Sequence, residues 1–286
     1  MSVAPRATSY LQVTPFALVM LAFVVVPVCI VVATSFFDFD FATLIPAFLM
    51  DNYVDIFTSR LTLDLYITVF RNIAIVWVIT SLLGFTIAYY VVFHVRTNIL
   101  KAIMLMACAI PFWTSGTIRM VSWVPLLGKE GLVNNALLAL HVINQPLDWL
   151  LYSPFSVILV YVNMLTLAML GPIANSMSKI DQSLVQAARD QGATEWQTIT
   201  NVIFPLAKPG IAVGSIFVVT AIMGDFFVVK TMSGNQVNVP AGQIMTEITS
   251  FEFPPAAAQS VVMMAVVIIF VASVLRMVDI RKELAP

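Results

Sequence analysis

Long apolar runs recur along the chain and are separated by short polar segments. A helix that crosses a membrane needs about 20 mostly apolar residues. Pro111 and Pro125 interrupt one of the runs and predict a kink or a break there. The pattern predicts an all-α, polytopic membrane protein with about six transmembrane helices. The predicted spans are Pro15–Phe36, Val69–Phe93, Ala102–Leu127, Phe155–Ile173, Pro209–Val229 and Ala257–Val278.

Composition supports a lipid environment for these runs. Of the 286 residues, 60% are hydrophobic and 10% are charged, against roughly 25% charged in a soluble domain. Cys29 and Cys108 both lie in apolar runs, which argues against a disulfide framework or a thiolate metal site. His94 and His141 are isolated, and no metal site is predicted. We interpret the first run as a retained helix, because no small-residue cleavage pattern follows it.

The distribution of charge orients the spans. If the N-terminus is cytoplasmic, the inner segments carry nine Lys and Arg residues against five acids, and the outer segments carry ten acids against five Lys and Arg residues. Positive charge favours the cytoplasmic side. We therefore expect both termini in the cytoplasm and a single transmembrane domain over residues 1–286.

The loop between the third and fourth spans lies on the outer side. Residues 128–153 are interpreted as an amphipathic helix followed by a turn at Pro146. Trp149 and Tyr152 fit an aromatic belt at the membrane interface. The leucines expected on the bilayer surface or on neighbouring helices are Leu132, Leu137, Leu138 and Leu140.

A cytoplasmic loop over residues 176–209 contains a short helix with a signal at each end. Asp181 is a good N-cap, because its carboxylate can accept from the free amides of the first turn. Gly192 is placed to end the helix in the left-handed conformation. Three- and four-residue spacing puts three apolar residues on one helix face. These residues are Leu184, Val185 and Ala188.

A second helix follows in the same loop. Thr194 and Gln197 have the spacing of a capping box. Pro205 and Pro209 are expected to end this helix just before the fifth span. These features alone are equally compatible with an ordinary amphipathic hairpin between two spans.

The order of residues in this loop matches a known signature. Gln186-Ala187-Ala188, three residues, Gly192, nine residues and then Val202-Ile203-Phe204-Pro205 resembles the signature of binding-protein-dependent ABC importer permeases. That signature is Glu-Ala-Ala, three residues, Gly, nine residues and Ile-x-Leu-Pro. The chain departs from it at Gln186, which replaces a carboxylate by an amide.

Motifs outside the loop are similar to the spermidine/putrescine-type branch of that family. They are Asn52-Tyr53, Pro111 to Ser115, Arg119, Trp123 and Gly224-Asp225-Phe226. Related branches that carry opines, other amines or iron chelates share parts of these motifs. The resemblance implies a type I ABC importer permease fold in the bacterial inner membrane.

Family resemblance also implies partners. They are a homologous second permease, usually a different chain, a dimer of ATP-binding-cassette ATPases below, and a solute-binding protein outside. The loop would dock on the ATPase through Gln186, Ala187, Ala188, Arg189, Asp190, Gly192 and Pro205. A phosphate-binding Gly-Lys-Ser/Thr loop is absent from the sequence, so we expect no ATP hydrolysis and no cofactor in this chain. ATP and Mg²⁺ would bind to the partner.

Ionisable and aromatic residues within the spans are candidates for the solute pathway, because charge in hydrocarbon is costly. Asp225 would meet a cationic amine, or else form a structural pair with Arg119 or Lys230. The aromatic candidates would offer ring faces to an ammonium group, or else pack in the bundle. The predicted pathway residues are Asp225, Trp123, Trp113, Tyr161, Asn163 and Arg119.

The predicted function is that of the permease subunit of an ATP-driven importer for a polyamine. Within the same class, the alternative solutes are an opine, an amino acid or an iron chelate. An ion-coupled secondary transporter is the alternative from another class, although it would usually show repeated halves and mid-span carboxylates. Neither paired acids nor a Ser/His pair predicts a membrane enzyme, and we expect no catalytic residues and no nucleic-acid partner.

Overall fold

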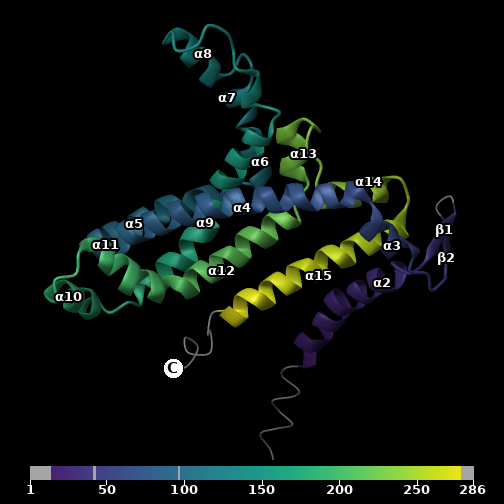
Figure 1. Ribbon diagram of the computed structural model, residues 1–286, viewed down its shortest axis with the longest axis horizontal. Coiled ribbons are helices and arrows are strands. Elements are labelled where there is room, and N and C mark those ends of the chain that lie inside the picture. Colours follow the sequence, from purple (N-terminus) through teal and green to yellow (C-terminus); the bar gives the residue numbers. More distant parts are fainter. Residues whose placement is uncertain (1–13, 41–42, 96, 278–286) are drawn as a thin grey trace, which may run out of the picture. The chain divides into compact units, whose positions relative to one another are not determined.

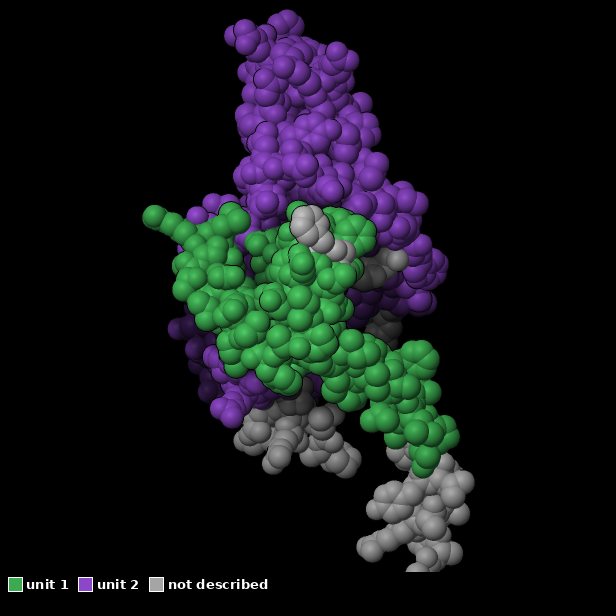
Figure 2. Space-filling view, turned by 90° about the vertical axis from the view of Figure 1, so that its right-hand side faces the viewer, with its two compact units in different colours: residues 1–63, 243–265 green, residues 64–242, 266–286 purple. Residues whose placement is uncertain are grey.

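A computed structural model describes residues 14–40, 43–95 and 97–277. Helices joined by short turns make up almost all of the described chain (Figure 1). The described residues form two compact units, one within residues 1–63 and 243–265 and the other within 64–242 and 266–286 (Figure 2).

Five helices of the described chain are long and apolar enough to cross a membrane. Each overlaps one of the predicted spans, and all five begin earlier in the sequence than predicted, by one to fourteen residues. The prediction that both termini are cytoplasmic concerns residues outside the described part of the chain. The five helices are Thr14–Thr34, Arg60–His94, Pro154–Ser178, Glu195–Met223 and Phe253–Met277.

The predicted third span is not one helix. Residues 98–127 form α5 (Asn98–Ala109), a 3₁₀ turn (Ile110–Trp113), α6 (Gly116–Val121) and α7 (Val124–Leu127). The predicted break near Pro111 is confirmed, and residues 102–127 do not form one continuous helix. With a rise of about 1.5 Å per residue, α5 is roughly 18 Å long, against a hydrocarbon thickness of about 30 Å.

The first unit begins with residues of the first span. A helical segment over residues 14–20 leads through a π-helical turn (Leu21–Val25) into α2 (Val26–Thr34). A hairpin follows, in which β1 (Asp38–Asp40) pairs antiparallel with β2 (Thr43–Ile45). These two short strands are the one departure from the all-α prediction in the described chain.

Polar side chains join the end of α2 to α3 (Asp51–Thr58). The Asn52 side-chain amide donates to the carbonyl oxygens of Ser35, at 3.1 Å, and Phe37, at 3.0 Å. The hydroxyl groups of Tyr53 and Ser35 are 2.7 Å apart. Asn52 therefore satisfies backbone carbonyl oxygens where the first span ends, and Tyr53 contacts the Ser35 side chain there, which gives this motif a structural task.

The chain passes from one unit to the other within long helices and within α14 (Pro240–Thr249). Helix α4 (Arg60–Tyr89) extends through a π-helical turn (Tyr90–His94). Near the C-terminus, α14 precedes α15 (Phe253–Met277). Residues of α4, α14 and α15 belong to both units.

Helices α9 (Pro154–Ser178) and α12 (Phe204–Met223) pack along each other in the second unit. A Cβ atom at Gly210 would lie 2.5 Å from the carbonyl oxygen of Pro172 and 2.9 Å from Cα of Ile173. Glycine therefore permits the close approach of the two backbones. The Ser176 hydroxyl adds a 3.2 Å hydrogen bond to the Leu206 carbonyl oxygen.

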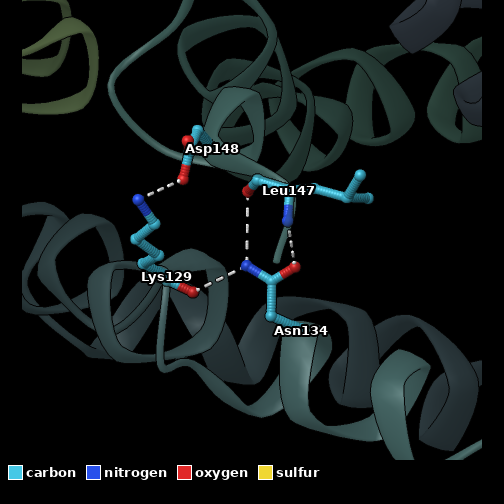
Figure 3. A network of polar contacts seen from close by, with 5 residues as sticks. Lys129, Asn134, Leu147 and Asp148 are labelled. Carbon is cyan, nitrogen blue, oxygen red and sulfur yellow. Dashed lines mark hydrogen bonds and ion pairs between the residues drawn. The ribbon is translucent and has the colours of Figure 1, made fainter. Parts of the chain in front are cut away.

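The loop after α7 is held by a buried amide (Figure 3). Asn134, with 0% of its surface exposed, donates to the carbonyl oxygens of Gly128, at 3.0 Å, and Leu147, at 3.3 Å, and accepts from the Leu147 amide at 2.8 Å. The Lys129–Asp148 ion pair, 2.9 Å long, is largely exposed and therefore adds little stability. Asn134 is the residue that closes this loop.

The amphipathic helix predicted in this loop is α8 (Leu132–Ala139), and a short 3₁₀ turn (Asp148–Leu150) follows the predicted turn. Leu132 and Leu140 are 69% and 72% exposed. Leu137 and Leu138 are partly buried. The helix thus leaves apolar surface free at both ends.

Candidate functional site

Helix α10 (Gln182–Asp190) of the cytoplasmic loop has both predicted end signals. The Asp181 carboxylate accepts a 2.9 Å hydrogen bond from the Ser183 amide, and this bond lowers the pKa of Asp181. At the other end Gly192 has φ of 82°, and its amide donates to the Arg189 carbonyl oxygen at 2.9 Å. A left-handed glycine therefore ends the helix, as predicted.

The second helix of the loop begins as predicted but continues further. In α11 (Glu195–Thr198), Thr194 and Gln197 form both bonds of a capping box. A π-helical turn (Ile199–Ile203) then joins α11 to α12, so that one helix runs from Glu195 to Met223.

The prediction that Pro205 and Pro209 end this second helix is wrong. Pro205 is the second residue of α12, directly after the π-helical turn, where the loss of one amide donor is tolerated. Pro209 lies within the first two turns of α12. The loop is therefore continuous with the fifth predicted span.

Glu195 connects the loop internally and to α4. Its carboxylate accepts from the Arg189 guanidinium at 2.9 Å and from the Tyr89 hydroxyl at 3.3 Å. Both charged side chains are at least half exposed, so each contact is individually weak. Together the two contacts connect α10, α11 and the end of α4. The sequence prediction omitted Glu195 and Tyr89, which no local pattern distinguishes.

The predicted apolar face of α10 is only partly confirmed. Val185 is buried, with 7% of its surface exposed, whereas Leu184 is 49% exposed. Because adjacent helical residues point in directions about 100° apart, Leu184 and Val185 lie on different faces. Gln186 and Ala187 are exposed, and Ala188 is partly buried. Together with Trp196, which is 71% exposed, Leu184 and Ala187 leave apolar surface for another protein.

Asp225 lies after α12, not within a span. Its Oδ1 atom accepts from the amides of Phe227, at 2.7 Å, and Val228, at 3.1 Å, which are the first residues of α13 (Phe227–Ser233). The structural role found for Asp225 is therefore a helix cap. Its predicted ion pair with Lys230 is absent from the described chain, where Lys230 is exposed.

Tyr161 is the predicted pathway residue that the structure brings to Asp225. It lies on α9, is 2% exposed and lies near the Asp225 carboxyl group, although its hydroxyl forms no hydrogen bond in the described chain. Helix α13 packs on α9, and the Ser156 hydroxyl fixes it by donating to the Met232 carbonyl oxygen at 2.7 Å. An aromatic hydroxyl and a carboxyl group are thus held together between these two helices.

The other predicted pathway residues are spread along the same bundle. Trp113 is 89% exposed at the end of the 3₁₀ turn. Arg119 on α6 and Trp123 before α7 are partly buried. Asn163 is exposed on α9. Within the described chain, no direct contact joins Trp113, Trp123 or Asn163 to Asp225.

A groove of about 850 Å³ extends from Trp113 along α9 to the start of α10. Its polar lining residues are Lys101, Asn175, Ser178 and Gln182. Asn163 and Asn175 are separated by twelve residues, about 120° beyond three full helical turns, so Asn163 lies on a different face of α9 from Asn175. A polar residue within an apolar run was the available signal for Asn175.

A second pocket, of about 720 Å³, surrounds Lys230. Tyr152, Phe226 and Phe227 provide aromatic walls, and Gln236 adds an amide. This pocket adjoins Asp225 through the Phe226–Phe227 turn. The carboxylate of Asp225 and the ammonium group of Lys230 are therefore five residues apart in the sequence, both after the C-terminal end of α12.

Comparisons with known proteins identify the chain's relatives. Residues 47–283 match the family described as binding-protein-dependent transport system inner membrane component. The spermidine/putrescine transport system permease protein PotB of Salmonella typhimurium is 33% identical over 220 residues, covering 75% of this chain and 74% of the relative. The protein of the same name from Haemophilus influenzae is 29% identical over 259 residues, covering 87% of each.

A solved structure has the same fold. It is the bacterial alginate ABC transporter in complex with an alginate pentasaccharide-bound periplasmic protein, and one of its chains aligns with a TM-score of 0.72 at 18% identity. The alignment covers 94% of this chain and 93% of the other.

Proposed function

The chain belongs to the family of binding-protein-dependent transport system inner membrane components, and from this we propose that it forms half of an import pathway for a polyamine. As a member of this family it is a multi-pass, non-catalytic permease of the inner membrane. An importer of this class works with an ATPase and with a periplasmic solute-binding protein.

The cytoplasmic loop is the proposed coupling element. Its exposed residues Leu184, Ala187 and Trp196 offer an apolar surface to a groove on the ATPase. Because α11 continues into α12, movement of the docked loop would shift a spanning helix directly. ATP and Mg²⁺ would bind to the ATPase. The proposed contact residues are Gln186, Ala187, Ala188, Arg189, Asp190, Gly192 and Pro205.

Arg189 has a more limited part in this proposal than its neighbours. Its guanidinium is engaged by Glu195, so it serves first to fix the angle between α10 and α11. Gln186 is exposed and presents an amide where the family signature has a carboxylate. We therefore expect a hydrogen-bonded contact with the ATPase at this position instead of an ion pair.

The observation that carries the polyamine assignment is likeness to spermidine/putrescine permeases over three quarters of the chain. Asp225 and Tyr161 support it, because a carboxylate beside an aromatic ring is suited to a primary ammonium group. The acidic outer segments would also raise the local concentration of cations. A second, homologous permease would supply the other wall of the pathway, opposite α9.

Lys230 favours a second candidate solute within the same class. Its ammonium group, in an aromatic pocket of about 720 Å³, would repel a polyamine but attract the carboxylate of an opine or an amino acid. Such a solute would place its amine at Asp225 and its acid at Lys230. Because the chain belongs to this family, the alternative function of an ion-coupled secondary transporter is excluded.

One experiment separates the two solutes. The complete importer is reconstituted with its ATPase and solute-binding protein, and ATP-dependent uptake of labelled spermidine is compared with uptake of a labelled opine. Saturable spermidine uptake that stimulates ATP hydrolysis is expected. Stimulation by the opine and not by spermidine or putrescine would contradict the polyamine assignment.

A further inference from the structure

Three polar side chains meet where α14 and α15 face each other in the first unit. Glu247 Oε1 accepts from the side-chain amides of Gln243 and Gln259, each at 3.0 Å. Gln259 is only 3% exposed, and Gln243 and Glu247 are partly buried. No residue of the proposed solute pathway or of the cytoplasmic loop belongs to this cluster.

The cluster has acceptor atoms without donors. Glu247 Oε2, Gln243 Oε1 and Gln259 Oε1 are all inaccessible to solvent and have no hydrogen-bond partner in the described chain. Buried acceptors are almost always satisfied in folded proteins. The cluster therefore offers three buried acceptors to a group that brings several donors or a positive charge.

The charge around the cluster is negative. Burial raises the pKa of Glu247, and the nearby Glu252 raises it further. Neither carboxyl group forms an ion pair with a Lys or Arg side chain in the described chain. A buried carboxylate without a counter-charge is costly, so a bound cation would stabilise the native structure.

We propose that Gln243, Glu247 and Gln259 bind a cation, which is either a primary ammonium group or an alkali metal ion. Three unpaired oxygens match the three N–H donors of an ammonium group, and oxygen atoms are also the ligands of hard metal ions. Protonation of Glu247 would supply only one O–H donor, which is not enough to satisfy all three oxygen atoms. The ammonium case rests on the proposed polyamine function, whereas the alkali-ion case does not.

Thermal unfolding of the purified importer, with its partner subunits in lipid nanodiscs, tests this site. The unfolding midpoint is measured against increasing putrescine, KCl or NaCl, with tetramethylammonium chloride as a cation that has no N–H donors. We expect one of the three probes to raise the midpoint, continuing logarithmically above its dissociation constant. The tetramethylammonium control should leave the midpoint unchanged, and the probe that acts identifies the source of the cation.

Two variants locate the effect. Glu247→Gln removes the charge and Gln259→Leu removes a buried acceptor at similar volume, so each should abolish the response to the cation. Asp55→Asn, which removes an exposed acid of the same unit, should retain it. If one cluster variant fails to assemble, the other gives the answer. If both fail, the wild-type titration decides, because a response shared by all four salts overturns the proposal.

Further outcomes separate this site from the proposed function. Absence of any cation-specific shift in the wild type, with normal spermidine uptake, overturns the site alone. Alternatively, KCl or NaCl raises the unfolding midpoint of the wild type but not that of Glu247→Gln. This result supports the site even if spermidine is not taken up and the polyamine assignment fails. A response that persists in both cluster variants also overturns the proposal.

Discussion

Asp225 combines a structural task with a proposed functional one. Its Oδ1 atom satisfies two amides at the start of α13, while its charge lies beside Tyr161. An asparagine in its place retains an oxygen that can accept from the same amides but carries no charge. The residue therefore allows the cap and the charge to be separated by two substitutions.

We expect Asp225→Asn to lower polyamine uptake while the complex remains assembled. Loss of one favourable charge contact in the pathway should reduce uptake at subsaturating spermidine about tenfold, equivalent to about 1.4 kcal/mol. Asp225→Ala should also lower the unfolding midpoint, because it removes the cap. For both variants, the initial uptake rate and the thermal unfolding curve are measured.

Asp64→Asn is the matched control, since Asp64 is an exposed acid of α4. It should leave uptake unchanged. If Asp225→Asn transports spermidine at the wild-type rate, the carboxylate has only its structural task and the charge contributes nothing to the pathway.

Asp181 gives a prediction in pH. Its pKa is lowered by the hydrogen bond from Ser183, so its contribution to α10 is present above the ordinary pKa of 3.8 and is lost as the pH falls through the lower pKa of the folded state. Hydrogen-exchange protection of α10 should exceed that of Asp181→Ala at neutral pH, and the difference should vanish in acid.

Asp181→Ser separates charge from capping in the same experiment. Serine is also a good N-cap but does not titrate in this range. Its protection relative to Asp181→Ala should stay constant with pH. A pH-independent difference in the wild type as well would mean that the ionised carboxylate is not what caps α10.

At the scale of elements, local signals were sufficient for the caps but not for the connections. Asp181, Gly192 and Thr194 act on amides a few residues away, so their roles could be predicted from sequence. The continuation of α11 into α12 depends on a π-helical turn, for which the sequence has no comparable signal. The prediction at Pro205 was therefore wrong because the sequence alone does not show that this proline lies directly after a π-helical turn, where it is tolerated.

The α10–α11 turn should be sensitive to the residue at position 192. A residue other than glycine in the left-handed region costs roughly 1–2 kcal/mol, and asparagine is better tolerated there than most. Gly192→Val should lower the number of spermidine molecules imported per ATP hydrolysed, whereas Gly192→Asn should largely preserve it. Normal coupling in the valine variant would contradict the role assigned to this turn.

The contact of α9 with α12 should be equally sensitive at Gly210. An added methyl group would press on the backbone of α9, 2.5 Å from the Pro172 carbonyl oxygen, and overpacking of this kind costs about 1–3 kcal/mol. Gly210→Ala should lower the unfolding midpoint. Gly242→Ala is the control, because its added atom would be 3.6 Å from the nearest neighbour. Equal midpoints in the two variants would mean that the helices can separate at little cost.

At the scale of the whole molecule, long-range contacts set the limit of sequence reasoning. Apolar length located the spans and Pro111 predicted a break in the third, yet apolar length alone did not predict its division into short helices. Tyr161 and Asp225 are 64 positions apart, and only the packing of α13 on α9 brings them together. The contacts of Tyr89 with Glu195 and of Gln259 with Glu247 likewise join residues that share no sequence pattern.

The exposed surface of α10 gives the last prediction, which concerns assembly. In a variant that carries Cys29→Ser and Cys108→Ser, a single Ala187→Cys substitution provides a thiol on the exposed face of the loop. A membrane-impermeant maleimide should label it in the isolated chain in detergent. Addition of the ATPase should slow labelling at least severalfold, because docking buries this face.

Gln236→Cys, in the exposed turn after α13, is the matched control for access to reagent. Its labelling rate should be the same with and without the ATPase, since the turn lies on the predicted outer side. Equal protection at both positions would indicate a general change in the sample. Unchanged labelling of the Ala187→Cys variant, in a complex that still hydrolyses ATP, would place the docking surface elsewhere on the chain, because α10 would then remain open to solvent while the ATPase is bound.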